Sequence, residues 1–161
     1  MRINFTLNDR PVNVELPGDL TLLRLLREHM KLTGTKCGCD TGNCGACAVI
    51  LDGNLVFSCL VMASRLDGRR VTTIEGIHGA DGGLSEIQEA IVHHGGIQCG
   101  YCTPAMVLAG EAFLNHHSNP TRDEIREAIS PVLCRCTGYQ QIIDAIEEAA
   151  RSRQFAHQTV D

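Results

Sequence analysis

Cysteines are the residues of this chain whose type and spacing could do chemistry, and the 161-residue sequence contains nine of them. Cys39, Cys44 and Cys47 have the spacing C-x4-C-x2-C, and Cys59 follows further along the chain. This spacing is typical of plant-type [2Fe-2S] sites, in which four soft thiolates hold the irons. We therefore predict that these four cysteines bind one cluster.

Glycines interrupt the first cysteine run at three positions, Gly38, Gly42 and Gly45. Glycine adopts positive φ angles and permits close backbone approach, both of which help a loop to wrap round an inorganic core. Residues 36–47 are too irregular for a helical or strand period, so we expect a loop there. The glycines strengthen the prediction of a cluster site.

A second set of cysteines occurs in the C-terminal half and consists of a C-x2-C pair and a C-x-C pair: Cys99, Cys102, Cys134 and Cys136. Thr103-Pro104 and Ser130-Pro131 indicate helix starts beside the two pairs. Helix starts have unpaired amides that favour an anionic group. We predict a second cluster here, and two clusters in adjacent domains suggest redox centres of one electron relay.

Zinc is the alternative metal, because four thiolates also suit Zn²⁺. Zinc sites usually contain two C-x2-C pairs, whereas the first set contains a C-x4-C interval, so iron and sulfur are favoured. The ninth cysteine is Cys37. If Cys37 were the first ligand in place of Cys39, six residues and not four would separate it from Cys44. We therefore interpret Cys37 as a spare thiol that fills space.

Charge and hydropathy exclude several classes of function. The net charge is −5 and there is no basic run, so no nucleic-acid partner is expected. Residues 1–11 have no signal-peptide pattern, and no apolar stretch approaches the ~20 residues of a membrane span. We expect a cytoplasmic protein whose thiols stay reduced and are free to bind metal.

The first half of the chain has strand patterning. Residues 3–7 and 12–16 alternate apolar and polar side chains around a turn at residues 8–11, and residues 48–51 and 55–59 flank Asp52-Gly53, a strong hairpin signal. Residues 71–74 offer a further strand. Between them, Thr21 could cap a helix with one apolar face: Leu22, Leu25, Leu26, His29 and Met30. These elements predict a small mixed sheet with one helix packed on it.

The second half has helical patterning. Ser85 with Gln88 and Thr121 with Glu124 are capping-box signatures, and Thr103-Pro104 begins a helix that extends to about residue 115. A short helix is expected from Ser130-Pro131 to Gly138, followed by a last helix with an apolar face: Ile142, Ile143, Ile146 and Ala149. We expect an α+β protein with domains at residues 1–76 and 85–151, a linker at 77–84 and a tail at 152–161.

Two pairs of adjacent histidines, His93-His94 and His116-His117, lie near predicted helix ends. Adjacent residues point to different sides of a helix, so we expect neither pair to share a metal ion. An interaction with the helix C-terminus is the simpler interpretation.

Three motifs resemble the small iron–sulfur subunit of the molybdenum hydroxylases, the xanthine dehydrogenase family. They are LTGTK followed by CDTGNCGAC within residues 32–47, QCGYCTP at 98–104 and LCRCTGY at 133–139. The resemblance covers residues 3 to about 150. The sequence departs from the family pattern at Ala105, where many relatives have glycine, and at Cys37.

The resemblance implies a β-grasp, plant-type ferredoxin-like domain followed by an all-α four-helix-bundle [2Fe-2S] domain. It implies that electrons pass from a molybdenum–molybdopterin (cytosine dinucleotide) centre on a large subunit to FAD on a medium subunit. The helical-domain cysteines would hold the cluster nearest molybdenum, and the ferredoxin-type cysteines the cluster nearest flavin. Gln98 and Cys136 would contact the pterin.

The expected partners are therefore a large molybdopterin-binding subunit and a medium FAD-binding subunit, in a heterotrimer that pairs into a heterohexamer. This chain would turn over no substrate alone, and the substrate would be chosen on the large subunit. Two alternatives stay open: a free-standing two-cluster ferredoxin-type carrier and a structural zinc-binding interaction module.

Overall fold

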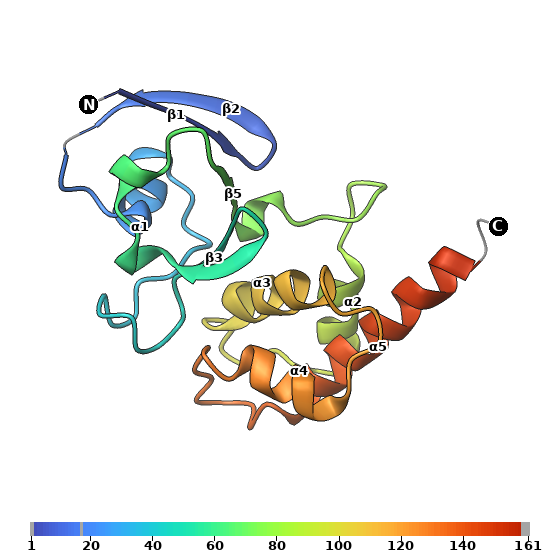
Figure 1. Ribbon diagram of the computed structural model, residues 1–161. Coiled ribbons are helices and arrows are strands. Elements are labelled where there is room, and N and C mark those ends of the chain that lie inside the picture. Colours follow the sequence, from blue (N-terminus) through green and yellow to red (C-terminus); the bar gives the residue numbers. More distant parts are fainter. Residues whose placement is uncertain (1, 17, 159–161) are drawn as a thin grey trace.

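The computed structural model describes residues 2–16 and 18–158, with a sheet in the N-terminal half and helices in the C-terminal half (Figure 1). The strands are β1 (Arg2–Leu7), β2 (Arg10–Glu15), β3 (Ala48–Leu51), β4 (Asn54–Phe57) and β5 (Arg70–Thr72). They form one sheet in the order β2-β1-β5-β3-β4. Strands β1 and β5 are parallel, and the other neighbours are antiparallel.

Two tight turns set the register of the sheet. Asn8 and Asp9, with φ angles of 49° and 61°, connect β1 to β2. The predicted turn at residues 8–11 was therefore too long, because Arg10 and Pro11 already pair with β1 as part of β2. Asp52 and Gly53 connect β3 to β4 with φ angles of 49° and 85°, which confirms the predicted hairpin. Strand β4 ends at Phe57, so the predicted extension of this strand to residue 59 was wrong.

One helical segment packs on the sheet, and the Thr21 hydroxyl caps it by accepting the Arg24 N–H at 3.4 Å. It consists of α1 (Leu22–Arg24) and a π-helical turn, η1 (Leu25–His29), in which the Met30 N–H donates to the Leu25 carbonyl at 3.0 Å. The predicted leucines are buried, but His29, the last residue of the π turn, is exposed, because the wider turn changes the direction of its side chain. Three short 3₁₀ turns follow in the same half: η2 (Ser58–Leu60), η3 (Ala63–Arg65) and η4 (Ile74–Gly76).

The helices of the C-terminal half, as far as it is described, are α2 (Glu86–His93), α3 (Thr103–Leu114), α4 (Arg122–Ile129) and α5 (Gln140–Gln158). Both predicted capping boxes are present, Ser85 with Gln88 and Thr121 with Glu124. Residues 77–84, all described, form neither helix nor strand. A mixed sheet followed by a helical domain confirms the expected α+β fold class.

Two helical predictions were wrong. Residues 130–139 form turns instead of a short helix, because their N–H groups bond elsewhere: Leu133 donates to the Cys44 carbonyl at 2.9 Å and Cys134 to the Tyr139 hydroxyl at 2.8 Å. Helix α5 continues to Gln158, beyond the predicted end of the domain. Arg153 on this extension donates to the buried carboxylate of Glu111 at 2.5 Å. The last three positions of the predicted tail lie outside the described residues.

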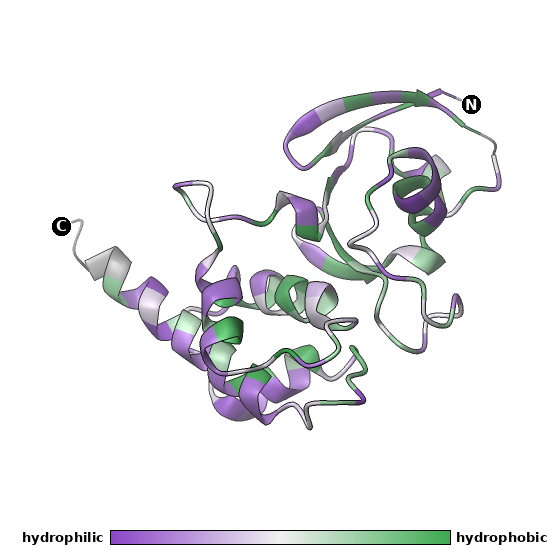
Figure 2. Ribbon diagram, turned by 180° about the vertical axis from the view of Figure 1, so that it is seen from behind, coloured by the Kyte–Doolittle hydropathy of each residue, from purple (hydrophilic) through white to green (hydrophobic). Residues whose placement is uncertain are grey.

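The two halves have separate hydrophobic cores that are joined through β3. All four residues of β3 are buried; Ala48 packs in the helical core, and Ile50 contacts Leu108 and Ala112 of α3. Helix α3 therefore lies against β3, as Figure 1 shows. Figure 2 shows that hydrophilic residues dominate the outer part of α5, away from this contact. The sheet and the helices thus hold the two cysteine-bearing regions in a fixed relation.

Candidate metal centres

The first cysteine loop is built around the sulfur of Cys39. It accepts hydrogen bonds from the backbone N–H groups of Thr41, Asn43 and Cys44 at 3.4, 3.3 and 3.4 Å. The Thr41 hydroxyl and then these amides lower the pKa of Cys39 to about 6. Convergent N–H donors stabilise a thiolate, the form of cysteine that binds metal.

The other end of the same site is buried. Cys47 and Cys59 pack together with Leu23, and the Gly42 N–H points at Cys59. Burial, together with the neighbouring Cys47, raises the pKa of Cys59 to about 11. A buried pair of thiols loses its protons when a metal replaces them, so this donor set fits a thiolate-bound cluster.

The glycines of the loop have separate roles. Gly42 and Gly45 have φ angles of +79° and +69°, as expected for a wrapping loop. A Cβ on Gly38 would lie 2.7 Å from the Cys44 sulfur, so Gly38 is required for space. A Cβ on Gly45 would lie 2.3 Å from the carbonyl oxygen of Pro131, which shows how closely this loop approaches the helical half.

The second cysteine set has a buried pair and an exposed pair. Cys102 and Cys134 are buried and in contact, whereas Cys99 and Cys136 are exposed with their sulfurs 3.6 Å apart. Cys102 is the N-cap of α3, so the predicted helix start beside it is confirmed. The corresponding start at Ser130 is absent, so only one of the two pairs lies at a helix start.

The buried pair has contrasting electrostatics. Burial, and then the contact with Cys134, raises the pKa of Cys102 to about 12. Burial also acts to raise the pKa of Cys134, but hydrogen bonds from the Thr137 hydroxyl and amide outweigh it, and the pKa is lowered. The Cys134 thiolate is therefore stabilised before any metal binds.

The two cysteine sets adjoin one another across the domain contact. The Leu133 N–H donates to the Cys44 carbonyl at 2.9 Å, and the Tyr101 hydroxyl donates to the Cys37 carbonyl at 2.7 Å. A cavity of about 270 Å³ is lined by cysteines of both sets: Cys39, Cys44, Cys99, Cys102, Cys134 and Cys136. A single hydrogen bond connects the backbone of Cys44 to that of Leu133, the neighbour of Cys134. The geometry suits electron transfer between two redox centres.

Gln98 is exposed in the connection between α2 and α3, beside the exposed Cys99. Sequence reasoning missed Tyr101 and Tyr139: the Tyr101 hydroxyl donates to the Cys37 carbonyl in the first cysteine loop, and the Tyr139 hydroxyl accepts from the Cys134 N–H. Both residues stand inside the cysteine motifs, but the Tyr101 bond joins residues distant in the sequence, and the Tyr139 bond depends on the turn conformation of residues 134–139. An aromatic residue in a motif does not by itself indicate such a contact.

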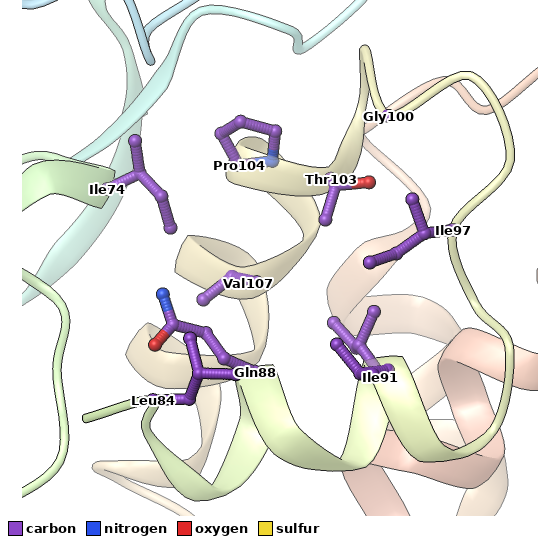
Figure 3. A pocket seen from close by; sticks show the side chains of 10 residues that line it. Ile74, Leu84, Gln88, Ile91, Ile97, Gly100, Thr103, Pro104 and Val107 are labelled. Atoms are coloured by element: carbon purple, nitrogen blue, oxygen red, sulfur yellow. The ribbon is translucent and has the colours of Figure 1, made fainter.

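A groove of about 330 Å³, lined partly by side chains of α2 and α3, is separate from the cysteine sites (Figure 3). Its lining includes Ile74, Ile97, Thr103 and Pro104. Among the residues that the structure describes, no cysteine lines this groove. It is therefore not a cluster site. Within the described residues, no helix has the length and apolarity needed to cross a membrane.

Comparison with known proteins divides the chain at the same place as the fold. Residues 5–73 match the family described as "2Fe-2S iron-sulfur cluster binding domain", and residues 73–147 match "[2Fe-2S] binding domain". The fold and the matched families define a two-cluster iron–sulfur protein.

Individual relatives narrow this class. The chain is 42% identical to the nicotine 6-hydroxylase small subunit of Paenarthrobacter nicotinovorans, over 92% of this chain and 89% of the relative. Quinoline 2-oxidoreductase from Pseudomonas putida 86 superposes with a TM-score of 0.90 at 39% identity, over 96% of both chains. Aldehyde oxidoreductase from Desulfovibrio gigas superposes with a TM-score of 0.92 at 36% identity, over 97% of this chain and 17% of that chain.

The chain belongs to the small [2Fe-2S] subunits of the molybdenum hydroxylases, the family that its three motifs resemble. It is an electron-transfer subunit of an oxidoreductase. In the Desulfovibrio gigas protein the matching region is a part of one much longer chain.

Proposed function

We propose that this chain relays electrons between a molybdenum–molybdopterin centre on a large subunit and FAD on a medium subunit. Cys39, Cys44, Cys47 and Cys59 would hold one [2Fe-2S] cluster, and Cys99, Cys102, Cys134 and Cys136 the other. When bound, each cluster stores and passes on one electron. The observation that carries the proposal is the contact of the two cysteine loops, joined by the hydrogen bond from Leu133 to Cys44.

The exposure of the cysteines supports an order for the relay. Cys99 and Cys136 are exposed and adjacent, so a partner subunit can approach the helical-domain site closely. Gln98 is exposed at the same edge, and its amide can both donate and accept hydrogen bonds to a pterin. This edge is the side that would face the large subunit, with Gln98 and Cys136 against the pterin. The ferredoxin-type site would then face the FAD subunit.

The names of the relatives bear on the substrate. They refer to nicotine, quinoline and aldehydes, although the parts that match this chain are similar in fold. This diversity supports a substrate pocket on a different subunit. The proposal includes a heterotrimer of small, medium and large subunits that pairs into a heterohexamer, in a cytoplasm that keeps the nine thiols reduced.

Affinity purification of the chain from its native host, at its native level, tests the proposal. We expect the chain to elute together with molybdenum and FAD. Each chain should contain about four irons and be accompanied by about one molybdenum and about one FAD. A brown chain that elutes alone with its iron would support a free-standing carrier and overturn the proposal. A colourless chain that contains zinc would overturn the iron–sulfur assignment as well.

A further inference from the structure

Three metal-ligating side chains lie together outside both cysteine sites. His93 is the last residue of α2, His94 is the cap residue that follows it, and Glu148 belongs to α5. His94 Nε2 lies 2.6 Å from Glu148 Oε2, and His93 Nδ1 lies 3.4 Å from Glu148 Oε1. One atom from each of the three residues lies within 4.8 Å of the others.

The prediction that His93 and His94 point to different sides and share no partner was wrong, because both rings contact the Glu148 carboxylate. His94 is the C-cap residue of α2 and its N–H still donates to the Ala90 carbonyl, so the two side chains leave the helix about 100° apart and reach different oxygens of one carboxylate. The two ring centroids are 5.2 Å apart, with an angle of 65° between the ring planes. Both imidazoles therefore reach one glutamate.

The geometry points to a site for a divalent transition-metal ion of the Zn²⁺ type, with His93, His94 and Glu148 as its three protein ligands. A tetrahedral Zn²⁺ holds its ligand atoms at about 2.0–2.1 Å, which separates two ligands by about 3.4 Å. His93 and Glu148 already have that separation, 3.4 Å. Two imidazoles on such an ion have ring centres about 5 Å apart, near the 5.2 Å observed.

Binding requires one rearrangement. His94 and Glu148 are 2.6 Å apart, so their hydrogen bond must open by several tenths of an ångström to admit the ion. The His93 side chain is 74% exposed, which leaves room for water in a fourth position.

A bound ion would connect α2 to α5 just before the loop that carries Cys99. Its nitrogen and oxygen ligands distinguish the site from the all-thiolate sites, which bind softer metal centres. The site is thus independent of the proposed electron relay.

Calorimetric titration with Zn²⁺ tests the site. The protein used is the full chain with both clusters bound, and every variant also contains Cys37→Ser, so that the exposed Cys37 thiol cannot bind zinc. We expect one Zn²⁺ per chain, binding about 100-fold more weakly after His94→Ala and at least about tenfold more weakly after Glu148→Gln. The matched control is His116→Ala in the other histidine pair, where His117 instead stacks on Phe113 at 4.4 Å. This control should leave the affinity unchanged.

Cluster absorbance and thermal unfolding check that each variant is folded. Zn²⁺ at a hundredfold excess over its Kd should raise the unfolding midpoint by about 5 °C in the background protein and not in His94→Ala. Anomalous scattering at the zinc edge should locate the ion between α2 and α5. Unchanged affinity in folded His94→Ala and Glu148→Gln proteins, equal weakening in the control, or no zinc binding would each overturn the proposal.

Discussion

The two cysteine sites reach similar donor sets by different means. The ferredoxin-type site takes three of its cysteines from one short run, and backbone amides of that run surround Cys39. The helical-domain site takes two distant pairs, and the side chains of Thr137 and Tyr139 support Cys134. The first site is shaped mainly by the backbone of one run, whereas the second depends on a fold that brings together two cysteine pairs distant in the sequence.

The sites also differ in exposure. Cys47 and Cys59 are buried and Cys39 and Cys44 are partly buried, whereas the helical-domain site has an exposed pair, Cys99 and Cys136. A site with an open edge can place its metal centre close to a partner. The helical-domain site is therefore suited to contact a partner directly, whereas the ferredoxin-type site is enclosed by its own loop.

The largest expected effect comes from the glycine that joins the two sites. Gly45→Ala places a Cβ 2.3 Å from the Pro131 carbonyl oxygen at a φ of +69°, so the loop must move away from the helical half. We expect a loss of about 3 kcal/mol or more in the free energy of unfolding. Chemical denaturation measures it.

Gly68→Ala is the matched control, because Gly68 has a similar φ of +72° with nothing within 4 Å of an added Cβ. Its cost should be only the conformational one, about 1 kcal/mol. Equal losses for the two variants would show that the contact between the cysteine loops is unimportant for stability.

Tyrosine hydroxyls give the next largest effect. Tyr139→Phe removes the acceptor of the partly buried Cys134 N–H, with an expected cost of about 1 kcal/mol. Tyr101→Phe removes an exposed bond to the Cys37 carbonyl and should cost about 0.5 kcal/mol or less. In Tyr139→Phe, potentiometric titration should show a shifted reduction potential for one of the two clusters and an unchanged potential for the other. Shifts in both clusters would contradict a local role.

The smallest effect concerns the ion pairs between α4 and α5. Arg122 contacts Asp144 at 2.7 Å and Glu147 at 2.8 Å, and its hydrogen bond lowers the pKa of Asp144. Because the folded pKa is depressed, the stabilisation is complete above the unfolded pKa of about 3.9 and is lost as the pH falls through the folded value.

Asp144→Asn should therefore cost at most about 0.5 kcal/mol at pH 7, since the pair is partly exposed. The difference from the unsubstituted protein should disappear in acid, as thermal melts at several pH values can measure. A difference that persists below the folded pKa would mean that Asp144 acts through packing and not through its charge.

The local elements were predictable from sequence. Ser85 with Gln88 and Thr121 with Glu124 form their capping boxes, and Asp52-Gly53 forms its hairpin, because each signal requires only residues close in the chain. The cysteine spacing predicted the first loop for the same reason, since its amides and thiols come from one segment.

The wrong predictions arose where distant partners decide the structure. The segment expected to form a helix at Ser130 instead uses Leu133 to bond with Cys44, a residue from the other half. Helix α5 extends past Ser152 because Arg153 pairs with Glu111 of α3, which apolar periodicity does not register. His93 and His94 meet at Glu148, again on another helix.

Iron content and the electron paramagnetic resonance spectrum of single cysteine variants test the central claim most directly. The claim is that two sets of four cysteines each hold one cluster and that Cys37 holds none. We predict that Cys39→Ala and Cys136→Ala each lose about two of the roughly four irons. Each variant should also lose one of the two resonance signals of the reduced protein, and the lost signal should differ between the two variants. Cys37→Ala should keep both signals. Loss of a signal in Cys37→Ala, or loss of the same signal in Cys39→Ala and Cys136→Ala, would contradict the account.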